Sequence, residues 1–395
     1  GEHTVALPIE QVELLESVVE AQQSWNESDD PDRELSYWDT VATAREAYRK
    51  RIRLGFGGEE KTQTFDQLRQ NLAALQAKVR SGIQRAVEMN DGIPPTYFAY
   101  NVTDFDFIAD ADGEPRRDGQ DRPYVRVNRF EPTVLPLFLE GPVHALKVQP
   151  DVASARDLYA KIKASDLYDR KLGMYKVNAS LEDQSHEIGR ARAFTPGWLE
   201  NESVFLHMEY KYLLEVLRAG LNDDFSEDLE RALICFQEPE FYGRSSLENS
   251  SFLVSSAHPD QTLHGAGFVA RLSGATAEFL SIWTTMMAGQ RPFFLKNGEL
   301  CLAFRPSLPG WLFDNDGRLT YTFLGSVRVT YHNYDKQDLV PDNGVSTRSV
   351  ILHLADRRQI ELTEGTIGEP YAQMVRASQI TNIDVHFQAD AEFHR

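Results

Sequence analysis

The sequence predicts a mainly helical fold with a β domain at its C-terminal end. Apolar residues recur at helical spacing in several stretches up to residue 287. From residue 319 onward they fall on alternate positions, which is the pattern of half-buried strands. The change of period places a boundary near residue 290. We therefore expect a helical domain over 1–290 and a β domain over 291–395.

The first two expected helices begin at pairs that resemble capping boxes. Ser36 is followed by Asp39, and Thr64 is followed by Gln67. In such a pair the first side chain accepts a hydrogen bond from the backbone at the start of the helix. Glycines end the first helical run, and the second continues to Met89.

Three further helices are expected over 151–168, 204–219 and 273–287, the last of which is ended by Gly289. Between the helix that continues to Met89 and the helix over 151–168, the segment 104–122 is rich in Asp, Gly and Arg. This segment is expected to form a polar surface loop. Antiparallel helices joined by long connections favour a helical toroid over a small bundle.

The C-terminal part is expected to be a β domain. The alternating pattern covers 319–331, 350–354, 360–362 and 383–387. A turn at Asp356–Arg358 separates the second and third of these segments.

Composition places the chain among ordinary globular proteins. Hydrophobic residues make up 42% of its 395 residues, and 60 acidic against 41 basic residues give a formal charge of −19. Nucleic acid and anionic membrane surfaces are therefore poor partners. The two cysteines, Cys235 and Cys301, have no metal-ligand spacing, so we expect no metal and no disulfide scaffold. A cytoplasmic location is expected.

A first candidate site segment begins at a turn and ends in a helix. Pro196 and Gly197 force the turn, and Glu200 and Asn201 then place a carboxylate and an amide just before the helix that carries His207. Such groups bind sugar hydroxyls, but they also cap helices. A lone helical histidine is usually structural or solvated.

A second candidate segment lies at the start of the last expected helix. Ser273 and Gly274 stand where free backbone N–H groups and the helix dipole favour an anion. With an imidazole they could hold phosphate, while the alternative is a plain N-cap and a packing glycine. Arg271 and Arg244 are either further phosphate ligands or surface or ion-pair arginines.

The segment 238–252 mixes aromatic rings with amides and carboxylates, a composition that suits carbohydrate recognition. Tyr242 and Arg244 are its candidate sugar-binding residues. A packed loop would use the same residue types.

These segments resemble the inverting β-glycoside phosphorylases of the cellobiose phosphorylase type. The family pattern P-G-x-x-E-N-x-x-x-F-x-H is present in register from Pro196 to His207. Three later family segments correspond to Leu272–Thr276, Gly289–Pro292 and Gly298–Pro309. Met174–Ser180 and Tyr242–Arg244 look more like the large β-glucan oligosaccharide phosphorylases.

The resemblance implies part of an (α/α)₆ barrel followed by a small β-sandwich. By position, it implies that His207, Ser273 and Gly274 bind phosphate, with Ser273 standing where the family usually has threonine. The implied reaction is a glycosyltransferase-type phosphorolysis of β-gluco-oligosaccharides to α-glucose 1-phosphate, with β-1,3 linkages favoured over β-1,2 and β-1,4. Inorganic phosphate is the co-substrate, and no other cofactor is expected.

The family's general acid is an aspartate in a D-W-N-D or D-W-D-D segment, and this sequence contains no such segment. Trp25–Asp30 resembles the D-W-N-D segment only superficially. The catalytic acid is therefore unassigned, and we expect the chain to be the C-terminal half of a longer phosphorylase. Its partner would be the missing half or a second chain, and a homodimer is left open.

Two other functions remain as alternatives. An inverting glycoside hydrolase would need a carboxylate base, for which Glu200 is the candidate. A non-catalytic half would bind glucan or serve assembly without turning glucan over.

Overall fold

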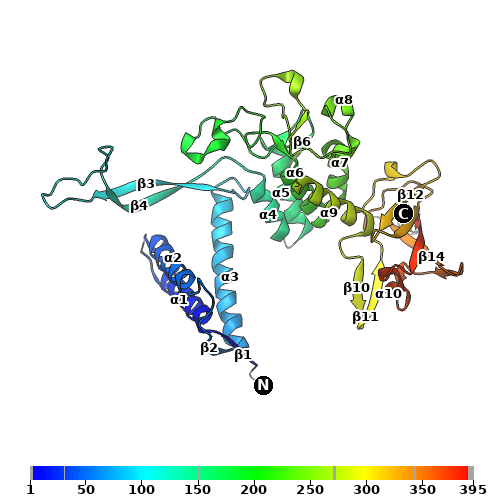
Figure 1. The fold of residues 1–395 in the computed structure, drawn as a ribbon, viewed down its shortest axis with the longest axis horizontal. Coiled ribbons are helices and arrows are strands. Elements are labelled where there is room, and N and C mark those ends of the chain that lie inside the picture. Colours follow the sequence, from blue (N-terminus) through cyan, green and yellow to red (C-terminus); the bar gives the residue numbers. More distant parts are fainter. Residues whose placement is uncertain (1–2, 31, 149–150, 270–272, 342–343, 390–395) are drawn as a thin grey trace. The chain divides into compact units, whose positions relative to one another are not determined.

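The computed structural model describes residues 3–30, 32–148, 151–269, 273–341 and 344–389 (Figure 1). The chain divides into two compact units, Gly1–Leu135 and Pro136–Arg395, and each is described by itself. The boundary expected near residue 290 falls inside the second unit. A separate domain over 291–395 stays a prediction.

The first unit joins three helices to a pair of short strands. Its elements are β1 (Thr4–Pro8), α1 (Ile9–Glu27), α2 (Arg33–Arg51), β2 (Glu60–Thr64) and α3 (Phe65–Glu88). Strands β1 and β2 pair antiparallel, and α1 packs against both α2 and α3.

The two predicted helix starts have different outcomes. Thr64 caps α3, because its hydroxyl accepts a hydrogen bond from the backbone N–H of Gln67 at 3.1 Å, so this prediction is confirmed. The start predicted at Ser36 is wrong. Helix α2 begins one turn earlier at Arg33, after Asp32.

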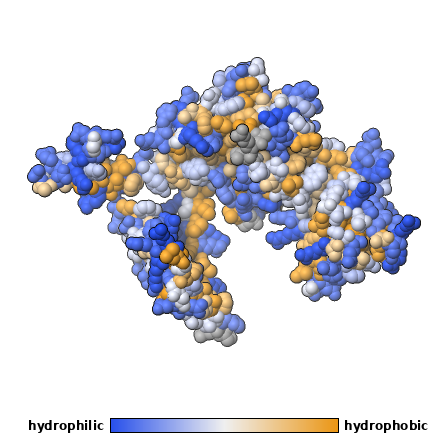
Figure 2. Space-filling model, viewed as in Figure 1, coloured by the Kyte–Doolittle hydropathy of each residue, from blue (hydrophilic) through white to orange (hydrophobic). Residues whose placement is uncertain are grey.

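One side of α3 is apolar and exposed. Leu72 and Val79 are each 60% exposed, and Ile83 is 48% exposed. These residues are spaced to lie on one face of the helix, and Figure 2 shows apolar surface along α3. Toward α1, the side chain of Gln22 donates a hydrogen bond to the carbonyl of Ala74 on α3.

A long antiparallel hairpin completes the first unit. Strands β3 (Phe98–Phe107) and β4 (Val125–Val134) pair along their whole length, with register shifts near Val102 and Asp104. The surface loop predicted over 104–122 is therefore partly wrong. Its first residues extend β3, and only the remainder connects the strands.

Six described helices fill the first part of the second unit, and three of them pack against one that is buried. They are α4 (Glu140–Val148), α5 (Val152–Ala164), α6 (Leu206–Arg218), α7 (Asn222–Ala232), the short α8 (Pro239–Tyr242) and α9 (Gly274–Ala288). Helix α6 packs against α4, α7 and α9. Helices α5, α6 and α9 confirm the three helices predicted in this region, with ends that differ by a few residues.

Short strands lie in the connections between these helices. One pair is β5 (Tyr168–Asp169) with β6 (Met174–Tyr175), and one three-stranded sheet has the order β7 (Val204–Phe205), β8 (Phe252–Leu253), β9 (Gly267–Phe268). Strand β7 leads directly into α6. The three-stranded sheet therefore lies at the N-terminal end of the central helix.

The C-terminal region holds two further sheets. The smaller has the order β10 (Phe293–Lys296), β11 (Glu299–Ala303), β16 (Thr366–Ile367). The larger has the order β12 (Arg318–Phe323), β13 (Val327–His332), β17 (Ile380–Ala389), β14 (Val345–Leu354), β15 (Gln359–Leu362). A short helix, α10 (Tyr371–Arg376), precedes β17. The predicted strands are confirmed, and Val329, Tyr331, Leu352 and Val385 are buried on one face of the larger sheet.

The predicted (α/α)₆ barrel followed by a β-sandwich is wrong. The described residues form ten α-helices and six separate sheets, and they show no toroid. Apolar periodicity identifies a helix and its buried face, but it does not state which helices share a core. Helices α1 to α3 belong to the first unit, and in the second unit α4, α7 and α9 pack against α6.

None of the described helices is both long enough and apolar enough to cross a bilayer.

Candidate functional site

His207 is the second residue of α6, directly after β7. Its side chain is 30% exposed, and its Nε2 atom lies 3.6 Å from Oε1 of Glu278 on α9. The ring of Phe205 meets the imidazole edge to face, with centroids 5.8 Å apart. The imidazole is therefore partly shielded and has a carboxylate on one side.

The structure brings the two sequence segments together at His207. A Cβ atom added to Gly274 would lie 2.4 Å from Nδ1 of the histidine, closer than real Cβ contacts allow. Gly274 is the first residue of α9. The absence of a side chain at this position is therefore what lets the start of α9 approach the imidazole.

Both helices begin near this imidazole, and neither start is closed by a side chain. Phe205 precedes α6 and Ser273 precedes α9, and neither makes a side-chain capping hydrogen bond. The first N–H of α6, that of Leu206, donates to the carbonyl of Ser251 at 3.1 Å. The other early N–H groups of a helix have no partner within the helix, and the helix dipole favours negative charge there. Ser273 is exposed and its side chain makes no capping hydrogen bond within the described residues, so it does not act as the N-cap that was the alternative.

Burial lowers the pKa of His207, and the ammonium group of Lys211 lowers it further. The carboxylate of Glu278 opposes both effects. An arriving anion would supply a second negative partner for the imidazole, but it would also meet Glu278. The charge that Glu278 carries therefore affects how strongly the site holds an anion.

The loop before β7 holds an unusual backbone conformation. Leu199 and Glu202 have φ values of 52° and 57°, in the left-handed region that few side chains adopt. The side chain of Asn178 secures this turn, because its amide donates to the carbonyl of Glu200 at 3.1 Å and its carbonyl accepts from the N–H of Glu202 at 2.6 Å. Such local strain persists only where the surroundings enforce it.

Glu200 and Asn201, predicted to bind sugar, are both engaged by the protein. Glu200 accepts a hydrogen bond from Arg190 at 2.7 Å, and its side chain is 34% exposed. The amide of Asn201 donates to the carbonyl of Phe194 at 2.7 Å. Its side-chain oxygen is buried and has no hydrogen-bond partner within the part of the chain that the structure describes.

Tyr242 and Arg244 secure the neighbouring loop. The buried hydroxyl of Tyr242 donates to the carbonyl of Glu248 at 2.7 Å and lies 2.6 Å from the hydroxyl of Ser250. Arg244 donates to the carbonyl of Gly267 at 3.0 Å and to the carboxylate of Glu248 at 2.7 Å. These contacts correspond to the packed-loop alternative for both residues.

A row of aromatic rings runs from this loop region to His207. Phe205, Phe252 and Phe268 are register partners on β7, β8 and β9, with neighbouring ring centroids 4.7 and 5.6 Å apart. Trp198 stacks on Phe268 at 3.9 Å. The sequence did not predict this row, because the pairing of three two-residue strands decides it.

Glu278 was also missed. The available signal was its spacing, since a residue four positions after Gly274 lies on the same face of α9. Arg271, the possible further phosphate ligand, and Leu272, the first residue of the family segment Leu272–Thr276, lie outside the described residues. Trp25 belongs to the first unit, where the ammonium of Lys78 lies 3.3 Å from the centroid of its ring.

No group of three or more histidine, cysteine or carboxylate side chains suited to a metal ion occurs within the described ranges. Comparison with known family models and with curated proteins gave no match to this chain.

Proposed function

We propose that this chain binds inorganic phosphate with His207, Ser273 and Gly274 and supports phosphorolysis of β-linked gluco-oligosaccharides. The observation that carries the proposal is the approach of Gly274 to the His207 imidazole where two helices begin. Uncapped helix starts, a hydroxyl and an imidazole are together suited to a phosphate dianion. The resemblance to the phosphorylases supplies the substrate class.

In the proposed reaction, a phosphate oxygen attacks the anomeric carbon while the bond to the glycosidic oxygen breaks. A general acid protonates the leaving oxygen, and the product is α-glucose 1-phosphate with inverted configuration. Phosphate is already an anionic nucleophile, so the protein needs to hold and orient it and not to activate it. We assign the acid to no residue, and we favour β-1,3 over β-1,2 and β-1,4 linkages.

The test is to incubate the protein with phosphate and laminari-, sopho- or cello-oligosaccharides and to measure glucose 1-phosphate. We expect phosphate-dependent product formation that His207→Ala reduces mainly by weakening phosphate saturation. Release of free glucose at a rate independent of phosphate would refute the proposal. Lys161→Ala serves as a control, because it removes a cation on α5 that pairs with Asp157 and is not among the groups that shift the pKa of His207.

One observation favours hydrolysis as a second candidate. A hydrolase needs a carboxylate that activates water. Glu278 supplies a carboxylate, with its Oε1 atom 3.6 Å from Nε2 of His207. The same assay separates the two reactions, since only a hydrolase releases free glucose without phosphate.

A further inference from the structure

The hairpin β3–β4 is a ribbon with one apolar face and one polar face. Each strand has ten residues, so the ribbon is roughly 33 Å long at about 3.3 Å per residue. None of the side chains on the apolar face is buried, and none of them is charged. They come from both strands and are Phe98, Tyr100, Val102, Phe105, Phe107, Val125, Val127, Phe130, Pro132 and Val134.

Two bulges keep this apolar face continuous. Successive side chains of a strand point to opposite faces, so apolar residues share a face only while they stay on alternate positions. The apolar positions are even-numbered up to Val102 and odd-numbered from Phe105 on β3, and they change likewise between Val127 and Phe130 on β4. The residue after Val102 and the residue after Val127 have no register partner, so each strand has its bulge where the apolar positions change.

The polar groups of the other face find partners within the ribbon. The amide of Asn101 donates a hydrogen bond to the hydroxyl of Thr133 at 2.9 Å across the two strands. Asp106 accepts a hydrogen bond from Asn128 at 3.0 Å and forms an ion pair with Arg126 at 3.5 Å. This face is therefore suited to water.

The apolar face is dominated by exposed aromatic rings. Tyr100 is 64% exposed and Phe130 42%, and their ring centroids are 6.5 Å apart. Phe105 is 45% exposed and Phe107 54%, with centroids 5.4 Å apart. Both pairs meet edge to face, which is a favourable geometry for aromatic rings.

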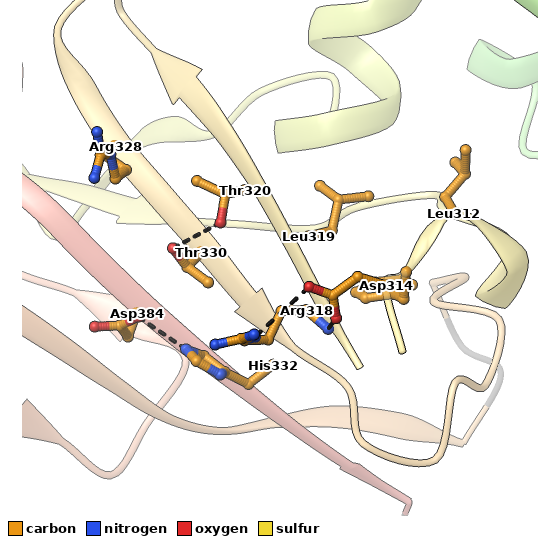
Figure 3. A pocket seen from close by; sticks show the side chains of 10 residues that line it. Leu312, Asp314, Arg318, Leu319, Thr320, Arg328, Thr330, His332 and Asp384 are labelled. Atoms are coloured by element: carbon orange, nitrogen blue, oxygen red, sulfur yellow. Dashed lines mark hydrogen bonds and ion pairs between the residues drawn. The ribbon is translucent and has the colours of Figure 1, made fainter. Parts of the chain in front are cut away.

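The five-stranded sheet has the same two-faced design, but its apolar face is covered. On β13, Arg328, Thr330 and His332 line a hollow on the polar face (Figure 3). Val329 and Tyr331 alternate with them and are fully buried on the opposite face. A ribbon of only two strands is marginally stable in water unless its apolar face packs against something. The face of β3–β4 therefore calls for a partner.

The chemistry of the ribbon disfavours a sugar and a membrane as that partner. A sugar needs ring faces turned outward as a flat platform, whereas the rings here meet edge to face. A membrane surface attracts basic segments. The segment 108–124, which joins the two strands, has five acidic and three basic residues.

A second copy of the chain fits the face in charge and in area. The chain has a formal charge of −19, but the face itself is uncharged, so two such faces can meet without repulsion between them. Four aromatic side chains with about half of their surface exposed supply roughly 300–500 Å². The aliphatic side chains of the face bring it toward about 600 Å² per copy, the lower end for specific interfaces.

We propose that two copies of the chain pack the apolar faces of their β3–β4 ribbons against each other. A twofold axis lies near Val102, in the middle of the strand, so that each copy presents the same patch to the other. The two ribbons stack about 10 Å apart, as in a β-sandwich. This interface does not depend on the function proposed for the His207 site.

The test is analytical ultracentrifugation of the full chain over a range of concentrations. We expect a monomer–dimer equilibrium with a dissociation constant on the order of micromolar. Phe105→Ser with Phe107→Ser should weaken it about tenfold or more, because both rings lie in the contact. Leu72→Ser with Val79→Ser is the matched control. It removes two side chains that are 60% exposed on α3 of the same unit and should leave the dissociation constant unchanged.

Salt and cross-linking identify the kind of contact and its place. Added NaCl should strengthen the dimer, because it screens the repulsion between two acidic chains and leaves an apolar contact intact. Cross-linking uses the Cys235→Ser protein, which lacks the exposed native thiol. In that protein, Val102→Cys should give a covalent dimer with a short bis-maleimide, whereas Asn101→Cys, on the polar face, should not.

Three results would overturn the proposal. A monomer at every concentration would show that the ribbon face is not covered by a second copy. A dimer that the α3 variant weakens and the ribbon variant does not would place the interface on α3. Equal cross-linking of the two cysteine variants would show that the copies do not meet through the apolar face. None of these results bears on phosphorolysis, because no reaction is measured.

Discussion

Gly274 and His207 are 67 positions apart in the chain, yet no side-chain atom could be added to Gly274 without meeting the imidazole, the nearest ring atom being 2.4 Å from an ideal Cβ. The neighbouring elements hold the ring in place, with Phe205 at its edge and Glu278 near Nε2. The candidate site therefore depends on a close approach between two helix starts, and that dependence can be tested directly.

Gly274→Ala should push the imidazole away from the start of α9. We expect phosphate binding to weaken by about tenfold or more, because the backbone N–H groups and the imidazole would no longer face one anion. Calorimetric titration with phosphate measures the effect. Gly82→Ala in α3 is the control. It has open space around it, and it should leave phosphate binding unchanged while stabilising its helix by about 0.5–1 kcal/mol.

Glu278→Gln should lower the pKa of His207 further. The carboxylate is the group that opposes the effects of burial and of Lys211, and the amide removes that opposition. An NMR titration of the His207 ring protons gives the value directly. An unchanged or raised pKa in the variant would show that the two side chains do not interact in solution.

Glu209 should make the protein less stable as the pH rises. Burial raises its pKa well above the ordinary carboxyl value, although the N–H of Tyr175 donates to it. The folded state therefore retains a proton that the unfolded state has lost, and stability falls from the ordinary carboxyl pKa up to the raised one. Glu209→Gln should match the parent at about pH 4 and exceed it increasingly at higher pH in urea unfolding. Glu230→Gln, exposed on α7, should show no such trend.

Asp384 should stabilise the large sheet above the acid range. Its burial acts to raise the pKa, but hydrogen bonds from His332 and His353 outweigh burial and leave the pKa lowered. The stabilisation is thus present above the ordinary carboxyl pKa and is lost as the pH falls through the lowered one. Asp384→Asn should reduce the melting temperature at neutral pH and flatten its fall in acid. If the melting temperatures of the parent and the variant fell in parallel as the pH is lowered, the stabilisation assigned to Asp384 would be contradicted.

Lys163 and Lys161, both on α5, allow a buried ion pair to be compared with a surface ion pair. Lys163 pairs with Asp228, which is 2% exposed and also accepts hydrogen bonds from Tyr159 and Tyr175. Lys163→Met leaves that carboxylate without its cation and should cost about 2–4 kcal/mol in unfolding free energy. Lys161 pairs with Asp157 at the surface, so Lys161→Met should cost less than about 1 kcal/mol.

The sequence predicted local structure well where one period dominates. The helices that became α5, α6 and α9 were found because their apolar residues repeat at helical spacing, and the strands of the large sheet because theirs alternate. The resemblance implied that His207 and Gly274 bind one ligand; the structure places Gly274 against the His207 imidazole, and their shared role in binding stays a prediction. Prediction from the sequence failed at the start of α2, and at the hairpin β3–β4 because polar side chains on exposed strands resemble a loop.

The sequence by itself determined the helices with a regular apolar repeat and the alternating strands of the large sheet, since neighbouring residues and their spacing control both. Only the tertiary structure decided that the helices form no toroid, that Glu278 faces His207, and that Arg328 and His332 border one hollow. These relations join residues far apart in the chain. They follow from which surfaces pack together, and periodicity carries no information about the partner of a surface.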